Sequence, residues 1–482
     1  MKVISLLKPL RIACTIGLSM VAGLLHAQTA FPQQVASPEG TILIYQPQPE
    51  KLKGNVLTGR AAMSLTPKGK TEPVFGAFWF TSIIDTGSSS GVAKVHDLHV
   101  TKVRWPESQS KSEEAFTKAV EAAAAQGILS VSNAALSASL ASAEREQQSL
   151  ADLKNDPPKI IFSKQLAVLL MFDGEPKWAD IENSGYERVV NTPFLVARDK
   201  SSKTAYLSSG KLWYSAKDPM GPWTSIKSGP ADLVKLLPAP DPKEPTPTRI
   251  PSVVVATEPT ELIVSDGEPN WKSVGEGKLL YVTNTENPWV RELATNQIYL
   301  LLSGRWFRAA SNDGPWTFVR ADQLPESFKN IPAGSDIGGL RTSVAGTEEA
   351  EDALLDASIP TTTAIKRSDA SLTVKYDGEP KFDPIKGTNV SLAINTATQV
   401  LLIANKYYAV ESGVWYVSTN ALGPWIVADS IPESEIQKIP PSSSAYNVTY
   451  VHVYQSTPEV VYVGYTPGYM GSYPYYGVPV YG

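Results

Sequence analysis

Asp266-Gly267-Glu268-Pro269 opens the stretch that decides the fold, because the same four residues recur at 173–176 and at 377–380. In each copy an aromatic residue follows the Asp by five positions, and an Asn-Thr pair begins eighteen positions after the Asp. Each copy continues through Ser-Gly and a Trp to a Gly-Pro-Trp triplet, which begins eight positions after that Trp. The chain therefore contains three copies of one module with an almost constant internal frame.

Each module is predicted to be a small antiparallel sheet or partial barrel. Between the fixed points lie runs of four to six residues rich in Val, Ile, Leu and Tyr, a pattern typical of short strands. The Asp-Gly-Glu-Pro sequence supplies a turn, because Gly accepts positive φ and Pro cannot donate to a ladder. We place the modules at 157–237, 252–335 and 361–440, with a Pro-rich linker at 238–251 and a second linker at 336–360.

The segments outside the repeats predict a mainly β protein with one helical insertion. Residues 40–106 alternate apolar and polar side chains and should form a separate N-terminal β domain. Residues 107–156 are rich in Ala, Glu, Gln, Leu and Ser, and we expect two helices or one kinked helix there, acting as a spacer or a packing pair before the first module. In the Tyr- and Gly-rich tail at 441–482, residues 450–465 can pair as a hairpin, and the last dozen residues are predicted to be poorly ordered.

The first 27 residues have the pattern of a secretory signal peptide, because Lys2, Lys8 and Arg11 accompany an apolar run too short to span a membrane. The only cysteine, Cys14, lies in that run, so the mature chain would have no disulfide and no cysteine nucleophile. A net charge of −5 with interspersed signs offers no basic stripe for nucleic acid. We therefore expect a periplasmic or extracellular protein with no transmembrane segment in the mature chain and no nucleic-acid partner.

Three patterns could carry chemistry, and each has a structural explanation. Residues 83–89 match the catalytic loop of pepsin-like aspartic proteases, but that chemistry needs a second such loop, which the sequence lacks. We interpret Asp85 as part of a polar hairpin connection, with a retropepsin-like homodimer as the remote alternative. His96 and His99 should point to opposite faces of a strand, and the two acidic residues of each Asp-Gly-Glu turn are too few for calcium. We expect no enzyme activity, no cofactor and no metal.

Tryptophan is the strongest remaining signal, because nine of the eleven Trp residues lie inside the three modules. Such residues commonly form the core of a small β module, and they can also be platforms on which sugar rings stack. The segment 303–309 (Ser-Gly-Arg-Trp-Phe-Arg-Ala), followed by Gly-Pro-Trp at 314–316, resembles bacterial proteins described as carbohydrate-binding family V/XII. The chitin- and cellulose-binding modules of that family present a Tyr and adjacent Trp residues to polysaccharide. Here Trp-Phe or Trp-Tyr pairs stand in place of their Trp-Trp pair.

The resemblance implies an exported, non-catalytic protein that binds polysaccharide through the aromatic residues of its modules. The alternative is a cell-envelope scaffold or adhesin that contacts other proteins. Neighbouring strand residues point to opposite faces, so we expect each aromatic pair to have one buried and one exposed member, with Tyr214 and Tyr416 outside. The predicted ligand-binding residues are Trp213, Tyr214, Trp223, Trp306, Phe307, Trp316, Trp415, Tyr416 and Trp425.

Overall fold

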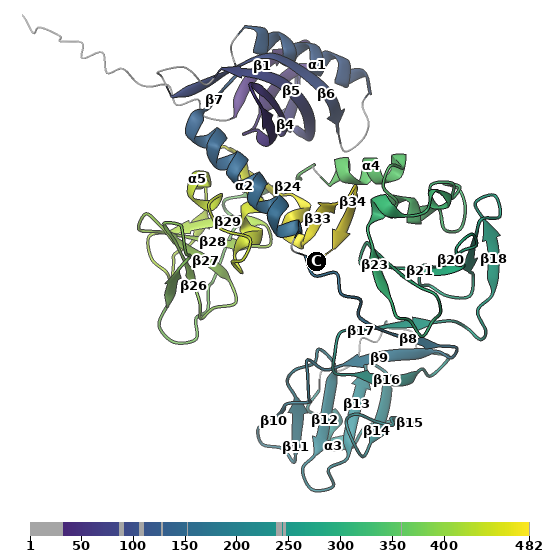
Figure 1. Ribbon diagram of the computed structural model, residues 1–482. Helices are drawn as coiled ribbons and strands as arrows, with labels where there is room; N and C mark the ends of the chain where they lie inside the picture. Colours follow the sequence, from purple (N-terminus) through teal and green to yellow (C-terminus); the bar gives the residue numbers. More distant parts are fainter. Residues whose placement is uncertain are drawn as a thin grey trace, which may run out of the picture.

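The computed structural model describes residues 32–481 apart from 86–90, 106–109, 127–128, 152, 238–242, 244–246 and 358. With 43% strand and 15% helix, the protein is mainly β, which confirms the predicted fold class. Figure 1 shows an N-terminal sheet with its helices and three repeat sheets, arranged around the C-terminal strands β33 (Ser472–Tyr475) and β34 (Val478–Tyr481).

The N-terminal domain is built on a seven-stranded antiparallel sheet in the order β1-β2-β4-β5-β6-β7, with β3 also paired to β4. Its three long strands alternate between buried apolar and more exposed residues, as a sheet covered on one face requires. The strands are β1 (Gln33–Ser37), β2 (Gly40–Ile44), β3 (Gln48–Lys53), β4 (Val56–Pro67), β5 (Val74–Asp85), β6 (Val92–Arg104) and β7 (Ser130–Ser132).

Two helices, α1 (Ser110–Ala125) and α2 (Asn133–Ala151), complete this domain. Phe116, Val120 and Ala124 are buried in the same core as the sheet, because their spacing places them on one face of α1. Strand β7, between the helices, pairs with β6. The helices predicted at 107–156 are therefore present, and of the two predicted roles α1 has the packing one, although it packs on the N-terminal sheet and not on the first module.

Each of the three repeats folds into a six-stranded antiparallel sheet in which sequential strands are neighbours. The identical strand order confirms the predicted equivalence of the repeats. In every copy Asp-Gly-Glu-Pro precedes the first strand and Gly-Pro-Trp precedes the last. The first sheet contains β10 (Trp178–Asp180), β11 (Tyr186–Val189), β12 (Leu195–Asp199), β13 (Ala205–Ser209), β14 (Leu212–Ala216) and β15 (Thr224–Ile226).

The other two repeat sheets use equivalent segments. The second contains β18 (Trp271–Val274), β19 (Leu279–Val282), β20 (Trp289–Glu292), β21 (Gln297–Leu302), β22 (Arg305–Ala309) and β23 (Thr317–Val319). The third contains β25 (Phe382–Pro384), β26 (Val390–Ala393), β27 (Gln399–Ile403), β28 (Lys406–Glu411), β29 (Val414–Ser418) and β30 (Ile426–Val427). The same cis Gly-Pro peptide bond occurs in all three Gly-Pro-Trp triplets.

The Asn of each repeat holds the Asp-Gly-Glu-Pro turn. In the second repeat the Asn284 side-chain amide donates to the carbonyl oxygens of Asp266 and Glu268, and its oxygen accepts from the Asn270 N–H. Asn191 and Asn395 make the same three bonds in their repeats, and all nine distances lie between 2.7 and 2.9 Å. The fixed eighteen-residue spacing therefore has a structural cause, because it brings this amide opposite the turn.

We expect Asn284→Ala to lower the free energy of unfolding by about 2 kcal/mol, because three hydrogen bonds to the turn are lost together. Asn284→Asp is the matched control: it can still accept from Asn270 but cannot donate to the two carbonyls. Denaturant unfolding followed by tryptophan fluorescence measures both variants. An alanine variant as stable as the parent would contradict this role for the Asn.

Each repeat sheet is covered on both faces. In the third repeat, β24 (Thr361–Lys366), β31 (Val451–Ser456) and β32 (Val460–Tyr465) form a sheet whose Val461 and Val463 cover one face. Helix α5 (Glu433–Ile436) and 3-10 helix η4 (Tyr446–Tyr450) cover the other face, where Ile436 and Val448 are buried. The first repeat has the same arrangement, with α3 (Ala231–Val234) on its second face.

The first and second repeats exchange the strands that cover them. Strand β8 (Lys159–Ser163) pairs in parallel with β17 (Thr260–Val264), and β9 (Ala167–Met171) pairs in parallel with β16 (Ser252–Ala256). Leu170 and Val255 pack on the first sheet, whereas Phe162 and Ile263 pack on the second. The predicted boundaries at 157–237 and 252–335 therefore need correction, because each of these ranges supplies a strand to the other repeat's core.

The segments predicted as a linker and a tail also belong to cores. In 336–360, η3 (Gly338–Ser343) and α4 (Glu348–Asp356) follow η1 (Ala321–Gln323) and η2 (Glu326–Phe328) on the second repeat. β31 and β32 form the predicted hairpin. After η5 (Pro467–Met470), β33 and β34 pair and bury Tyr475 and Val480 in the second repeat. The expectation of poor order at the C-terminus is wrong, because this hairpin has an apolar face.

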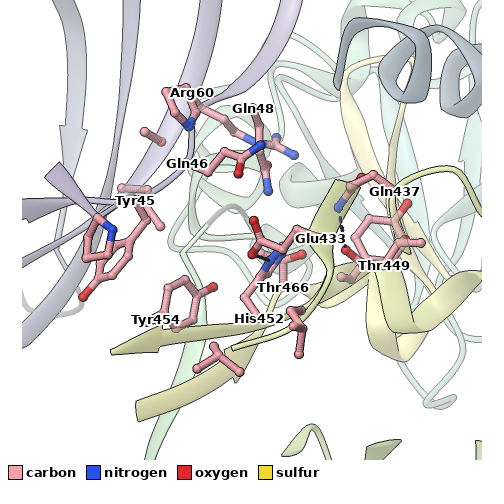
Figure 2. A pocket seen from close by; sticks show the side chains of 18 of the residues that line it. Tyr45, Gln46, Gln48, Arg60, Glu433, Gln437, Thr449, His452, Tyr454 and Thr466 are labelled. Carbon is pink, nitrogen blue, oxygen red and sulfur yellow. Dashed lines mark hydrogen bonds and ion pairs between the residues drawn. The ribbon is translucent and has the colours of Figure 1, made fainter. Parts of the chain in front are cut away.

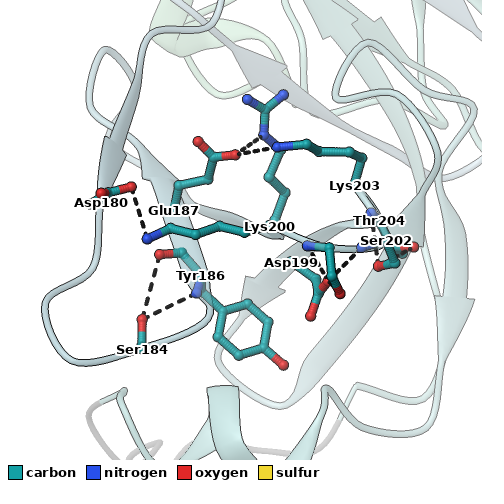
Figure 3. Close-up of polar contacts among 11 residues, drawn as sticks. Asp180, Ser184, Tyr186, Glu187, Asp199, Lys200, Ser202, Lys203 and Thr204 are labelled. Atoms are coloured by element: carbon teal, nitrogen blue, oxygen red, sulfur yellow. Dashed lines mark hydrogen bonds and ion pairs between the residues drawn. The ribbon is translucent and has the colours of Figure 1, made fainter.

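The strands and turns of the first repeat carry a network of polar contacts (Figure 3). Glu187 accepts from Arg198 Nε at 2.6 Å and also pairs with Lys203, and the hydrogen bond from Arg198 lowers the pKa of Glu187. Asp199 accepts from Ser201 and Ser202 in the following turn, and these bonds lower its pKa to about 2. These carboxylates are engaged in holding strands and turns.

Candidate functional site

The aromatic pairs of the repeats lie inside the protein. The prediction that neighbouring members point to opposite faces is confirmed, because Trp213 and Tyr214 belong to separate cores, as do Trp415 and Tyr416. The prediction that one member is exposed is wrong: Tyr214 is 3% and Tyr416 is 8% exposed. The physical reason is that strands cover one face of each sheet and helical segments cover the other.

Internal hydrogen bonds satisfy the polar groups of several of these residues. Trp306 Nε1 donates to the Ser343 carbonyl at 2.7 Å, and Trp415 Nε1 donates to the Val451 carbonyl at 2.8 Å. The Tyr214 hydroxyl donates to the Pro251 carbonyl at 2.9 Å. Among the predicted ligand-binding residues, the buried ones are Trp213, Tyr214, Trp306, Phe307, Trp415, Tyr416 and Trp425.

Trp223 and Trp316, of the Gly-Pro-Trp triplets, are half-buried. Their indole N–H groups donate to carbonyls four residues earlier, at 3.1 and 3.4 Å. Trp316 also stacks on Phe162, with ring centroids 6.1 Å apart. The structure therefore brings no cluster of the predicted residues to one exposed surface, although these two indoles retain some exposure.

The other patterns with candidate chemistry are separate from one another. Asp85 ends β5 opposite Lys94, and residues 86–89 of the protease-like loop lie outside the described residues. His96 and His99 are both exposed, so the expectation of opposite faces is wrong. A register shift between Thr81 and Ile83 is the cause, because it adds a residue to this part of β6. Within the described residues, no three His, Cys, Asp or Glu side chains gather to hold a metal ion.

A cleft of about 790 Å³ lies between the N-terminal domain and the third repeat. We call it the interdomain cleft. Figure 2 shows Gln46, Gln48 and Arg60 on one side, with Glu433 and His452 on the other. Its lining comes from the stretch 45–50 and β4, from α2, and from the third repeat at 429–437 and 449–456. Segments almost four hundred residues apart in the chain thus form one site.

Aromatic packing and one long-range hydrogen bond hold the two sides of the cleft together. Tyr45 and Phe75 of the N-terminal domain pack against Tyr454 of β31, with ring centroids 5.0 and 5.6 Å from that of Tyr454. Arg145 of α2 donates to the Gln437 carbonyl at 2.9 Å. Burial raises the pKa of Tyr45 to about 12, and raises the pKa of Tyr454 well above 10. Both hydroxyls therefore remain protonated at neutral pH.

Most charged groups of the cleft have an internal partner. Arg60 donates to Gln48 Oε1 at 2.9 Å and lies 3.8 Å from Glu50. Asp429 accepts from Ser456 and pairs with Arg367, and these hydrogen bonds lower its pKa. Glu433 lies 3.6 Å from His452 Nδ1.

Two buried polar atoms in the cleft lining have no hydrogen-bond partner: His452 Nε2 and Gln455 Oε1. Leaving a buried polar group unpaired costs about 1–3 kcal/mol, so such groups often mark a place for a ligand or water. No sequence motif marks this site. Its nearest signal is the concentration of Tyr in the C-terminal tail, because Tyr446, Tyr450 and Tyr454 all line the cleft.

Comparison with known proteins gave no family: no protein-family model matches the chain, and a search of curated proteins found no match. Among the residues that the structure describes, no helix has the length and apolar character needed to cross a membrane.

Proposed function

We propose that this protein is an exported, non-catalytic binding protein that holds a saccharide chain in the interdomain cleft. The observation that carries the proposal is a cleft large enough for a ligand, whose lining mixes apolar and polar side chains and includes two buried polar atoms without partners. Its volume of about 790 Å³ falls within the ~300–1,000 Å³ of typical ligand sites. Export rests on the N-terminal signal pattern, and the saccharide class is also supported by the sequence resemblance.

The side chains of the cleft suit a ligand rich in hydroxyl groups. Side-chain amides both donate and accept hydrogen bonds and carboxylates accept them, and four glutamines (Gln46, Gln48, Gln437 and Gln455) line the cleft. Tyr446 and Tyr450 are half-buried, so each can offer both an apolar ring and a polar hydroxyl to a sugar. The proposed site lies away from the nine module aromatics, seven of which are buried and therefore lack the surface that sugar stacking needs.

Binding to chitin, cellulose and peptidoglycan, measured with the full mature chain and with soluble fragments of each, tests this proposal. We expect Gln455→Ala to weaken saccharide binding roughly three- to tenfold, because an acceptor for the ligand is removed. Its stability should stay near that of the parent, since Gln455 Oε1 has no internal partner.

Trp223→Ala and Trp316→Ala are the matched controls, because these half-exposed indoles lie outside the cleft. Both should retain binding. If these two variants lose binding while Gln455→Ala retains it, the binding site lies in the modules and not in the cleft. If the chain binds none of the saccharides, the alternative of an envelope scaffold that contacts other proteins is favoured.

A further inference from the structure

The polar groups of the interdomain cleft that lack an internal donor or a permanent cationic partner are two hydrogen-bond acceptors and one carboxylate. Of the charged residues in the lining, Arg60 and Glu50 offset each other, and Asp429 is offset by Arg367. Glu433 is left with a histidine as its ion-pair partner. Its side chain is 32% exposed, so the carboxylate is reachable from the cleft. Arg60 is the lone Lys or Arg among the described lining residues, so no permanently charged cation of the lining offsets Glu433.

The histidine itself contributes an acceptor. The Glu433 carboxylate beside Nδ1 favours the tautomer that carries its proton on that nitrogen. Nε2 then has a free lone pair, and it is buried without a partner. The buried Oε1 of Gln455, three residues along the chain, is likewise an acceptor without a donor.

A donor-rich, positively charged group meets this need better than a hydroxyl does. An ammonium group has three N–H donors and one positive charge, whereas a hydroxyl has one donor and no charge. An anionic sugar would instead meet a carboxylate and unpaired acceptors.

Resting on the proposed function, we propose that Glu433, His452 and Gln455 make the cleft selective for saccharides that carry free amino groups, and that they exclude saccharides bearing carboxylates. The juxtaposition of one exposed carboxylate with two buried, unpaired acceptors carries this inference. The ligand class is therefore an amino-sugar chain in its ammonium form.

Calorimetric titration of the full mature chain tests this selectivity with three ligands of equal length: a glucosamine oligomer, its N-acetylated form and a uronic-acid oligomer. We expect the parent to bind the free-amine oligomer roughly tenfold more tightly than the acetylated one, with no detectable binding of the uronic acid. The preference should weaken as salt rises, because the charges are partly exposed.

Glu433→Gln should abolish the preference for the free amine while leaving binding of the acetylated oligomer unchanged. Glu435→Gln is the matched control on the same helix, because that carboxylate is paired with Lys438 and lies outside the cleft lining. It should keep the tenfold preference.

The failures of the two proposals are distinguishable. Equal affinity for free-amine and acetylated oligomers in the parent would overturn the selectivity and leave saccharide binding intact. An oligolysine peptide that binds as tightly as the amino sugar would show that the cleft recognises amines on any polymer, which overturns this assignment. Absence of binding by every saccharide would overturn the proposed function itself.

Discussion

Trp415→Ala should lower the stability of the third repeat by roughly 3–5 kcal/mol, because it removes the full volume of a side chain with 0% exposure. The indole fills the core beneath α5 and η4, between Leu401 and Val448 among others. Its N–H is also the donor for the Val451 carbonyl, which would lose that partner. Since Val451 begins β31, we expect the loosening to reach the wall of the interdomain cleft.

Amide hydrogen exchange of β28, β29 and β31 measures this effect within the intact chain, together with the denaturant midpoint. Trp223→Ala is the comparison, because that indole is half-buried and should cost about 1–2 kcal/mol. Equal protection of β29 in the parent and in Trp415→Ala would contradict the assignment of Trp415 to the core. A saccharide platform at this position would also predict a stable variant, so the same experiment bears on the original hypothesis.

The repeats could be predicted from the sequence because their signals are local. Gly267 accepts positive φ, at 85°, where the Asp-Gly-Glu-Pro turn needs it, and the Asn284 bonds fix the distance to the next strand. Alternation along a strand likewise predicted that Trp415 and Tyr416 point to opposite faces. These features depend on neighbours in the chain.

Exposure could not be predicted in the same way, because it depends on what covers each face. Tyr416 is buried by Val461 and Val463, which come from a sheet formed by residues before and after the third repeat. The interdomain cleft is still less visible in the sequence, since it joins the stretch after β2 to β31. The packing of α1 on the N-terminal sheet likewise depends on contacts between residues that are distant in the chain.

Because β8 covers the second repeat sheet although it precedes the first, a substitution in β8 should destabilise the second repeat. Phe162 lies in β8, before the first repeat sheet, yet its ring centroid is 4.7 Å from that of Trp289 and 6.1 Å from that of Trp316 in the second repeat. We expect Phe162→Ala to destabilise the second repeat by about 2–3 kcal/mol, because the side chain is half-buried in that core. Amide exchange should quicken in β20 and β21.

Val255→Ala is the reciprocal variant, because β16 follows the first repeat sheet along the chain and packs back on it. It should cost about 1 kcal/mol and quicken exchange in β12 and β13. If Phe162→Ala instead loosened the first sheet, the covering strands would belong to the repeats that they adjoin in sequence. Because each of these two repeats is covered in part by a strand from the other, neither can bury both faces of its sheet alone. The two repeats should therefore unfold as one cooperative unit. The third repeat draws its covering sheet from β24, β31 and β32, and its stability should therefore be independent of Phe162.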